Sequence, residues 1–463
     1  MQNPTNIYGS GQNEKSLNLK KLLLSISVVL FITIIFSGTT VIASYKNELM
    51  LISAGICVIT FLISNLKFRI LNITAFVWLL VICLMVAGAI NSYNPTLSIQ
   101  YALIYISCFI AMITQFDRED YIFFIKAAEI VSLIFVISII LEVLIPQLFA
   151  NYLGFIFDSD RRTELIQKEL NIGIFSGLSG EKAEAAYVAN IFIATQICRM
   201  FVNKRIDIKH LLLTLFGSLA LMLTGKRTLL IIPVLALIVL MLVNQIKGKY
   251  IKFILFGCGA ICAVYFLILF VPQAAVTFNR LFASTDNTLS GRNYLWNVCM
   301  EMFKSNPLFG KGIASFNHYA NMDYYVNIMC VQQGMDEWTV QAHNIYYQYL
   351  GELGLTGFIP AVGIIAFTFI RTILLKKQIP LMDITQKMIY HFSLYIQVWF
   401  IVYGFTGNVG HYTQDLIMYF MCVGMYLYLQ HTFSTKNSEK QYPNIAGKDF
   451  AYENRIGNIS KSN

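Results

Sequence analysis

Long apolar runs alternate with short polar segments along most of the chain. A helix of roughly 20 apolar residues crosses the hydrocarbon core of a membrane, and about twelve runs reach or approach that length. They lie at residues 22–44, 49–66, 70–90, 97–115, 121–146, 183–201, 209–224, 227–246, 251–271, 357–375, 387–406 and 412–430. The pattern predicts an all-α fold, a polytopic transmembrane helical bundle of about 12 spans.

The composition of the chain agrees with this pattern. Hydrophobic residues make up 57% of the chain and charged residues 13%, whereas soluble domains carry about 25% charged residues. The first apolar run lacks a small-residue cleavage site and is long enough to span, so it is not typical of a removed signal peptide. We therefore exclude a soluble globular protein and expect a multi-pass membrane protein.

Lysine and arginine gather in alternate loops. They concentrate in the N-terminus and near residues 67–69, 118, 199–209, 247–252 and 371–387. Because positively charged loops stay in the cytoplasm, we predict a cytoplasmic N-terminus (1–21), a membrane domain (22–431) and a disordered cytoplasmic tail (432–463). Attraction to the anionic inner leaflet explains the net charge of +9, so no nucleic-acid partner is needed.

Two outward segments, about 147–182 and 272–356, are longer than connections need to be. Loops of such length are usually functional. In the larger one, Ser290 is placed to cap a helix that carries Arg292 and Trp296, and glycines near 310–312 predict a turn. Its tyrosines and tryptophans fit two interpretations. They are interfacial anchors, or they hold sugar rings, because flat aromatic faces pack against the C–H faces of a sugar.

Three residues on the predicted outer side are candidates for chemistry. Taken singly, Arg227 fits a residue that snorkels to lipid phosphate, Arg292 a solvated helix residue and His343 a hydrogen-bonded interfacial histidine. Together they fit another interpretation. Two guanidinium groups bind a phosphate or pyrophosphate bidentately, and a neutral imidazole beside them can take a proton from a hydroxyl.

The order of the motifs resembles the O-antigen ligase and O-antigen polymerase superfamily. The motifs are TGKRTLL, then SGRNYLW followed by NPLFGKGIASF, then HNIYYQYLGELGLTG. In that family a histidine precedes a glycine with ten intervening residues, a spacing that His343 and Gly354 reproduce. The resemblance covers roughly residues 221–373. Lys226 departs from it, since the family often has a small residue before the arginine.

The resemblance implies a metal-independent glycosyltransferase at the outer face of the cytoplasmic (inner) membrane, with no cofactor. Its donor would be an oligosaccharide on undecaprenyl pyrophosphate, and it would work in the bilayer beside a flippase and a chain-length regulator. Arg227 and Arg292 would stabilise the pyrophosphate, and His343 would accept or orient the proton of the attacking hydroxyl. The substrate-binding set is Arg227, Arg292, Arg280, Trp296, Tyr346 and Gly354.

The helix after His343 carries two further features. Glycines recur every three residues, at 351, 354 and 357, so another backbone can approach this side closely. Glu352 lies deeper in the same helix, where we expect it to pair with a buried cation or polar group; as an alternative base it ranks with His411 behind His343.

Other functions stay open at this stage. We favour a polymerase that extends another lipid-linked repeat unit of a capsule, exopolysaccharide or O-antigen, because long outer loops suit a growing polysaccharide. A ligase would use the same donor and a lipid A core as acceptor. A flippase or transporter would be expected to show internal repeats and broken helices at the midplane. Asp158-Ser159-Asp160 resembles a metal-binding motif, but arginines follow it at once and we interpret it as a solvated loop.

Overall fold

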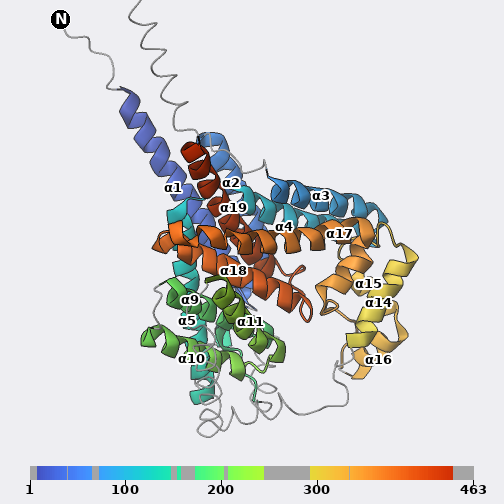
Figure 1. The fold of residues 1–463 in the computed structure, drawn as a ribbon. Coiled ribbons are helices and arrows are strands. Elements are labelled where there is room, and N and C mark those ends of the chain that lie inside the picture. The colour runs from blue at the N-terminus through green and yellow to red at the C-terminus, as the bar shows by residue number, and fades with distance from the viewer. Residues whose placement is uncertain are drawn as a thin grey trace, which may run out of the picture.

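The structure, a computed structural model, describes residues 8–38, 40–64, 72–146, 154–157, 173–202, 207–244, 292–332 and 334–441. Within these ranges the long elements are all helices (Figure 1). They are α1 (Tyr8–Ile35), α2 (Lys46–Ser64), α3 (Ile73–Gly88), α4 (Pro95–Ile113), α5 (Arg118–Leu144), α9 (Lys182–Val202), α10 (Ile208–Leu223), α11 (Arg227–Asn244), α14 (Arg292–Ser305), α15 (Phe316–Met322), α16 (Tyr324–Gln332), α17 (Ile345–Leu374), α18 (Ile384–Gly404) and α19 (Thr413–Gln441).

The helices follow the apolar runs. Eleven of the runs coincide with a described helix, and the run at 251–271 lies outside the described residues. By length and composition, 8 of the helical stretches in the described ranges are able to cross a membrane. The predicted all-α polytopic bundle is therefore confirmed.

Several helix boundaries differ from those expected. Helix α1 runs from Tyr8 to Ile35 rather than over residues 22–44. Helix α17 begins at Ile345 rather than near residue 357, because Asn344 caps it and a full first segment precedes a kink at Gly354. Helix α19 continues to Gln441 and so enters the segment predicted to be disordered. Extension of an existing helix requires no new nucleus, which explains why the polar residues after 431 continue it.

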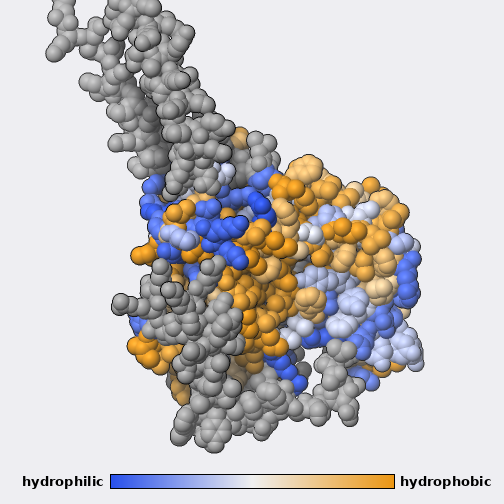
Figure 2. All heavy atoms as spheres, viewed as in Figure 1, coloured by the Kyte–Doolittle hydropathy of each residue, from blue (hydrophilic) through white to orange (hydrophobic). Residues whose placement is uncertain are grey.

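The hydrophobic residues form two separate cores. The larger core lies among the membrane helices. The smaller core belongs to the segment with α14, α15 and α16, which was predicted to face outward and lies beside one end of α17 (Figure 1). Its buried residues are Leu295, Val298, Cys299, Met302, Phe316, Ala320, Val326, Cys330, Trp338 and Ala342. Figure 2 shows apolar residues over α3, α4 and α17 and a more polar surface over the outer segment.

Segments expected on one side of the membrane lie together. Lys21 pairs with Glu119 at 3.4 Å, and Arg118 pairs with Asp383 at 2.9 Å, so the middle of α1 meets the start of α5, which meets the start of α18. All four residues belong to segments predicted to lie on the inner side. At the opposite ends, the Thr413 hydroxyl donates to Asn47 at 2.8 Å, which joins two loops assigned to the outer side.

Candidate functional site

Helix α14 is fixed to the turn that precedes α17. Arg292 is the first residue of α14 and is half-buried, and Trp296 follows one turn later on the same face. The Trp296 indole donates through Nε1 to the carbonyl oxygen of Ala342 at 3.1 Å and stacks on Tyr347, with ring centroids 5.4 Å apart and planes 6° from parallel. Trp296 therefore anchors the residue directly before His343.

His343 occupies an unusual backbone conformation at the meeting point of three elements. Its φ is 57°, in the left-handed region that non-glycine residues rarely adopt. Its N–H donates to the side-chain oxygen of Asn408, in the turn between α18 and α19, at 2.7 Å. The next residue, Asn344, caps α17 by accepting from the N–H groups of Tyr346 and Tyr347. The turn between α16 and α17 therefore holds His343 in a fixed position.

The electrostatic surroundings of His343 are positive. Burial lowers the pKa of His343 to about 3, and the positive charges of Arg292, Lys226 and Lys182 contribute to this decrease. The imidazole is therefore neutral at physiological pH. These three cations come from α14, from the turn between α10 and α11 and from the start of α9, so the fold gathers segments that are far apart in the sequence.

The cations also act on one another. Burial lowers the pKa of Lys226 to about 8; Glu181 opposes this decrease, whereas Lys182 and Arg292 add to it. Burial also lowers the pKa of Arg292. Positive charges held together at partly buried positions repel each other, and an anionic ligand would relieve that repulsion. The arrangement is suited to binding a phosphate or pyrophosphate.

Lys226 and Arg227 have different positions, although they are adjacent. Arg227 is exposed at the first position of α11. Lys226, which sequence reasoning treated only as a departure from a motif, lies half-buried and acts on His343. Lys182 was also missed. The available signal for both was a lysine at the predicted outer end of an apolar run.

Gly354 lies at a kink, against the loop after α14. Its φ of 60° and ψ of −171° interrupt α17. A Cβ there would lie 2.4 Å from the carbonyl oxygen of Leu308 and 2.5 Å from the nitrogen of Gly310. The glycine at this distance from His343 therefore allows the backbone of α17 to pack closely against the 307–312 loop.

The kink exposes backbone groups that this loop then satisfies. The carbonyls before it and the N–H groups after it all bond to loop residues. The bonds are Lys311 N to Gly351 O at 3.1 Å, Gly312 N to Glu352 O at 2.8 Å, Leu355 N to Pro307 O at 2.9 Å and Thr356 N to Leu308 O at 3.0 Å. At Gly351 a Cβ would lie 2.7 Å from the carbonyl oxygen of Cys299. The expected close backbone approach is present, and its partners are α14 and the loop.

The remaining predicted site residues have no described contact with His343. The Tyr346 hydroxyl donates to the carbonyl oxygen of Ile401 at 2.9 Å, and its ring packs on Phe405. It therefore holds α17 against α18. Arg280 and the Asp158–Asp160 motif lie outside the described residues.

A buried polar network lies behind His343. Glu352 and His411 are both buried, and Glu352 Oε2 is 2.9 Å from His411 Nε2. Gln348 donates to Glu352 Oε1 at 3.0 Å, and its own side-chain oxygen accepts from the N–H of Ala342 at 3.2 Å. The prediction that Glu352 pairs with a buried polar group is confirmed. The network supports the His343 turn from inside the bundle.

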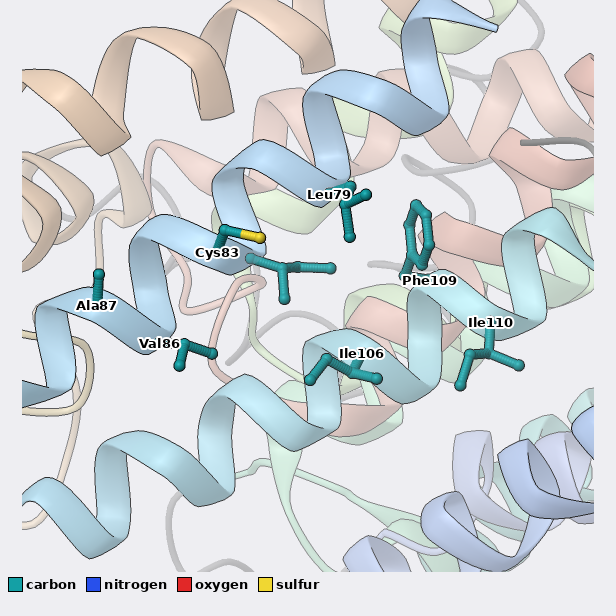
Figure 3. Close-up of a pocket in the computed structure, with 8 residues that line it drawn as sticks. Leu79, Cys83, Val86, Ala87, Ile106, Phe109 and Ile110 are labelled. Carbon is teal, nitrogen blue, oxygen red and sulfur yellow. The ribbon is translucent and has the colours of Figure 1, made fainter. Parts of the chain in front are cut away.

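An apolar groove of about 540 Å³ lies between α3 and α4. Its lining residues, drawn in Figure 3, are Leu79, Ile82, Cys83, Val86, Ala87, Ile106, Phe109 and Ile110. Such a lining suits hydrocarbon, because it offers almost no polar atoms. These helices contribute none of the cations around His343, so the groove is separate from the candidate site.

Part of the chain matches a known protein family. Residues 212–362 match the family described as O-antigen ligase. This region, about a third of the chain, includes Lys226, Arg292, His343 and Gly354. No curated protein matches the chain. The match supports the O-antigen ligase and polymerase superfamily, as the motifs indicated, and thereby a role in surface-polysaccharide synthesis.

Proposed function

We propose that this chain, whose residues 212–362 match the O-antigen ligase family, is a surface-polysaccharide polymerase. It transfers a glycan from undecaprenyl pyrophosphate to another lipid-linked repeat unit at the outer face of the cytoplasmic membrane. The observation that carries the proposal is the neutral imidazole of His343 among the charges of Arg292, Lys226 and Lys182. A donor with an anionic leaving group and an acceptor hydroxyl would meet there.

The mechanism follows from the charge that develops during transfer. As the anomeric C–O bond breaks, negative charge grows on the pyrophosphate, and fixed cations in a partly buried site stabilise it. Arg292 and Lys226 take this role, with Arg227 at the start of α11 as a further contact for the phosphates. Because these cations supply the stabilisation, we propose that the reaction needs no metal. His343 accepts or orients the proton of the attacking hydroxyl.

A ligase is the second candidate, because the matching family is described as O-antigen ligase. A ligase shares the donor and the cationic site and differs in the acceptor, which would be a lipid A core. The experiment gives the purified protein one labelled lipid-linked donor and offers the two acceptors separately. Longer glycans on lipid-linked repeats support the polymerase. Transfer confined to lipid A core supports the ligase, and absence of any transfer contradicts both.

A further inference from the structure

The side chain of Asn408 contacts His343 at two points. Asn408 lies in the turn between α18 and α19 and is 3% exposed. Its Oδ1 accepts from the backbone N–H of His343 at 2.7 Å, and its Nδ2 lies 3.5 Å from the ring nitrogen Nδ1 of His343. The same Nδ2 lies 3.4 Å from the hydroxyl of Tyr412. One amide therefore meets both the backbone and the ring of His343.

The backbone contact fixes which way the amide points. A backbone N–H can only donate, so the atom of Asn408 that meets it must be the oxygen. The NH₂ group then faces Nδ1 of the imidazole. An N–H pointing at Nδ1 favours a ring without a proton on that nitrogen, because a protonated Nδ1 would place two donors against each other. In a neutral imidazole the proton is then on Nε2.

We infer that Asn408 is a positioning residue that keeps the proton of the His343 imidazole on Nε2, so that His343 donates a hydrogen bond to a phosphate oxygen of its substrate. This inference rests on the proposed function and replaces the proton-accepting role given to His343 there with stabilisation of the leaving phosphate. With the proton on Nε2, His343 orients and stabilises the anionic group and does not remove a proton from the acceptor; as the anomeric C–O bond breaks, the proton of the acceptor hydroxyl leaves with the pyrophosphate. The charges of Arg292, Lys226 and Lys182 favour the same neutral state.

Tautomer and turnover are measured separately. The chain contains 6 histidines, so ¹⁵N-histidine-labelled protein in lipid bilayers gives a solid-state spectrum in which His343→Ala identifies the His343 signals. We expect a protonated Nε2 and an unprotonated Nδ1. Asn408→Asp keeps the oxygen that accepts the His343 N–H but turns a second acceptor toward Nδ1. It should move the proton to Nδ1 and lower turnover of the lipid-linked donor at least about tenfold.

Asn344→Asp is the matched control, because it adds the same charge one residue away and still caps α17. It should keep the wild-type tautomer. A proton on Nδ1 in the wild-type protein would overturn the inference, as would an Asn408→Asp protein that has the swapped tautomer and wild-type turnover. The spectrum needs no turnover. A wild-type protein that transfers no glycan would therefore contradict the proposed function while the tautomer is still decided.

Discussion

Replacement of Gly354 by alanine tests whether the His343–Gly354 spacing is a backbone fit. With φ 60° and ψ −171°, Gly354 occupies a region that is essentially restricted to glycine, and another residue there costs about 1–3 kcal/mol. The new Cβ would also lie 2.4 Å from the carbonyl oxygen of Leu308. The 307–312 loop must then move, which endangers the bonds from Leu355 and Thr356 at about 1 kcal/mol each. We expect Gly354→Ala to destabilise the protein by about 3–5 kcal/mol.

The assay is thermal unfolding of purified protein in detergent, followed by the fluorescence of its 4 tryptophans. In a chain of 463 residues, a loss of this size should lower the melting temperature by roughly 3–5 degrees. Gly363→Ala is the matched control, because it changes the same helix at a position where a Cβ meets nothing within 4 Å. The reasoning is refuted if both variants melt at the same temperature. The interpretation of Gly354 as a substrate-binding residue would then be preferred.

Three further predictions concern the titratable residues His343, Lys226 and Glu352. His343→Ala should lower turnover at least about 100-fold, while binding of the lipid-linked donor, measured separately, should fall much less because the cations remain; equal losses of both would contradict this role. Lys226 has a pKa of about 8 beside Glu181, Lys182 and Arg292, so it loses its charge as pH rises through that value. Donor affinity should therefore fall between about pH 7 and pH 9, and Lys226→Arg should abolish this fall; an unchanged pH profile in the variant would exclude Lys226. Glu352→Ala, which leaves the buried His411 and the Phe316 N–H without their acceptor, should destabilise the protein by about 3–5 kcal/mol, and a milder loss in Glu352→Gln would be expected because one acceptor oxygen remains.

Much of the architecture could be predicted from the sequence. Apolar runs specify membrane helices because the backbone must satisfy its own hydrogen bonds in hydrocarbon, and the described helices follow these runs. The partner of Glu352 could be predicted only as a class, since a buried carboxylate requires some polar group. The identity of that group, His411, depends on how α17 and the α18–α19 turn pack.

The site itself was only partly predictable. The motifs made His343 and Arg292 candidates, but Asn408 lies 65 residues after His343 and carries no motif of its own. For a different reason, the sequence could not show whether Lys226 or Arg227 acts on His343. The two residues are adjacent where α11 begins, and the packing of that helix end leaves Lys226 half-buried and Arg227 exposed.

The orientation of the bundle is a prediction from the distribution of lysine and arginine. Cysteines introduced singly between 292 and 332 should react in intact cells with a membrane-impermeant thiol reagent, and a cysteine at Lys376 should not. Labelling of the opposite pattern would place His343 in the cytoplasm, where the proposed lipid-linked donor is not displayed.

The most direct test of the central claim is release of undecaprenyl pyrophosphate by purified protein that receives a lipid-linked repeat unit in the presence of EDTA. We predict that the wild-type protein releases it together with longer glycans, and that His343→Ala, at equal protein level, releases it at least about 100-fold more slowly. Equal release by both proteins, or release by the wild type only after Mg²⁺ or Mn²⁺ is restored, would contradict a metal-independent transfer centred on His343.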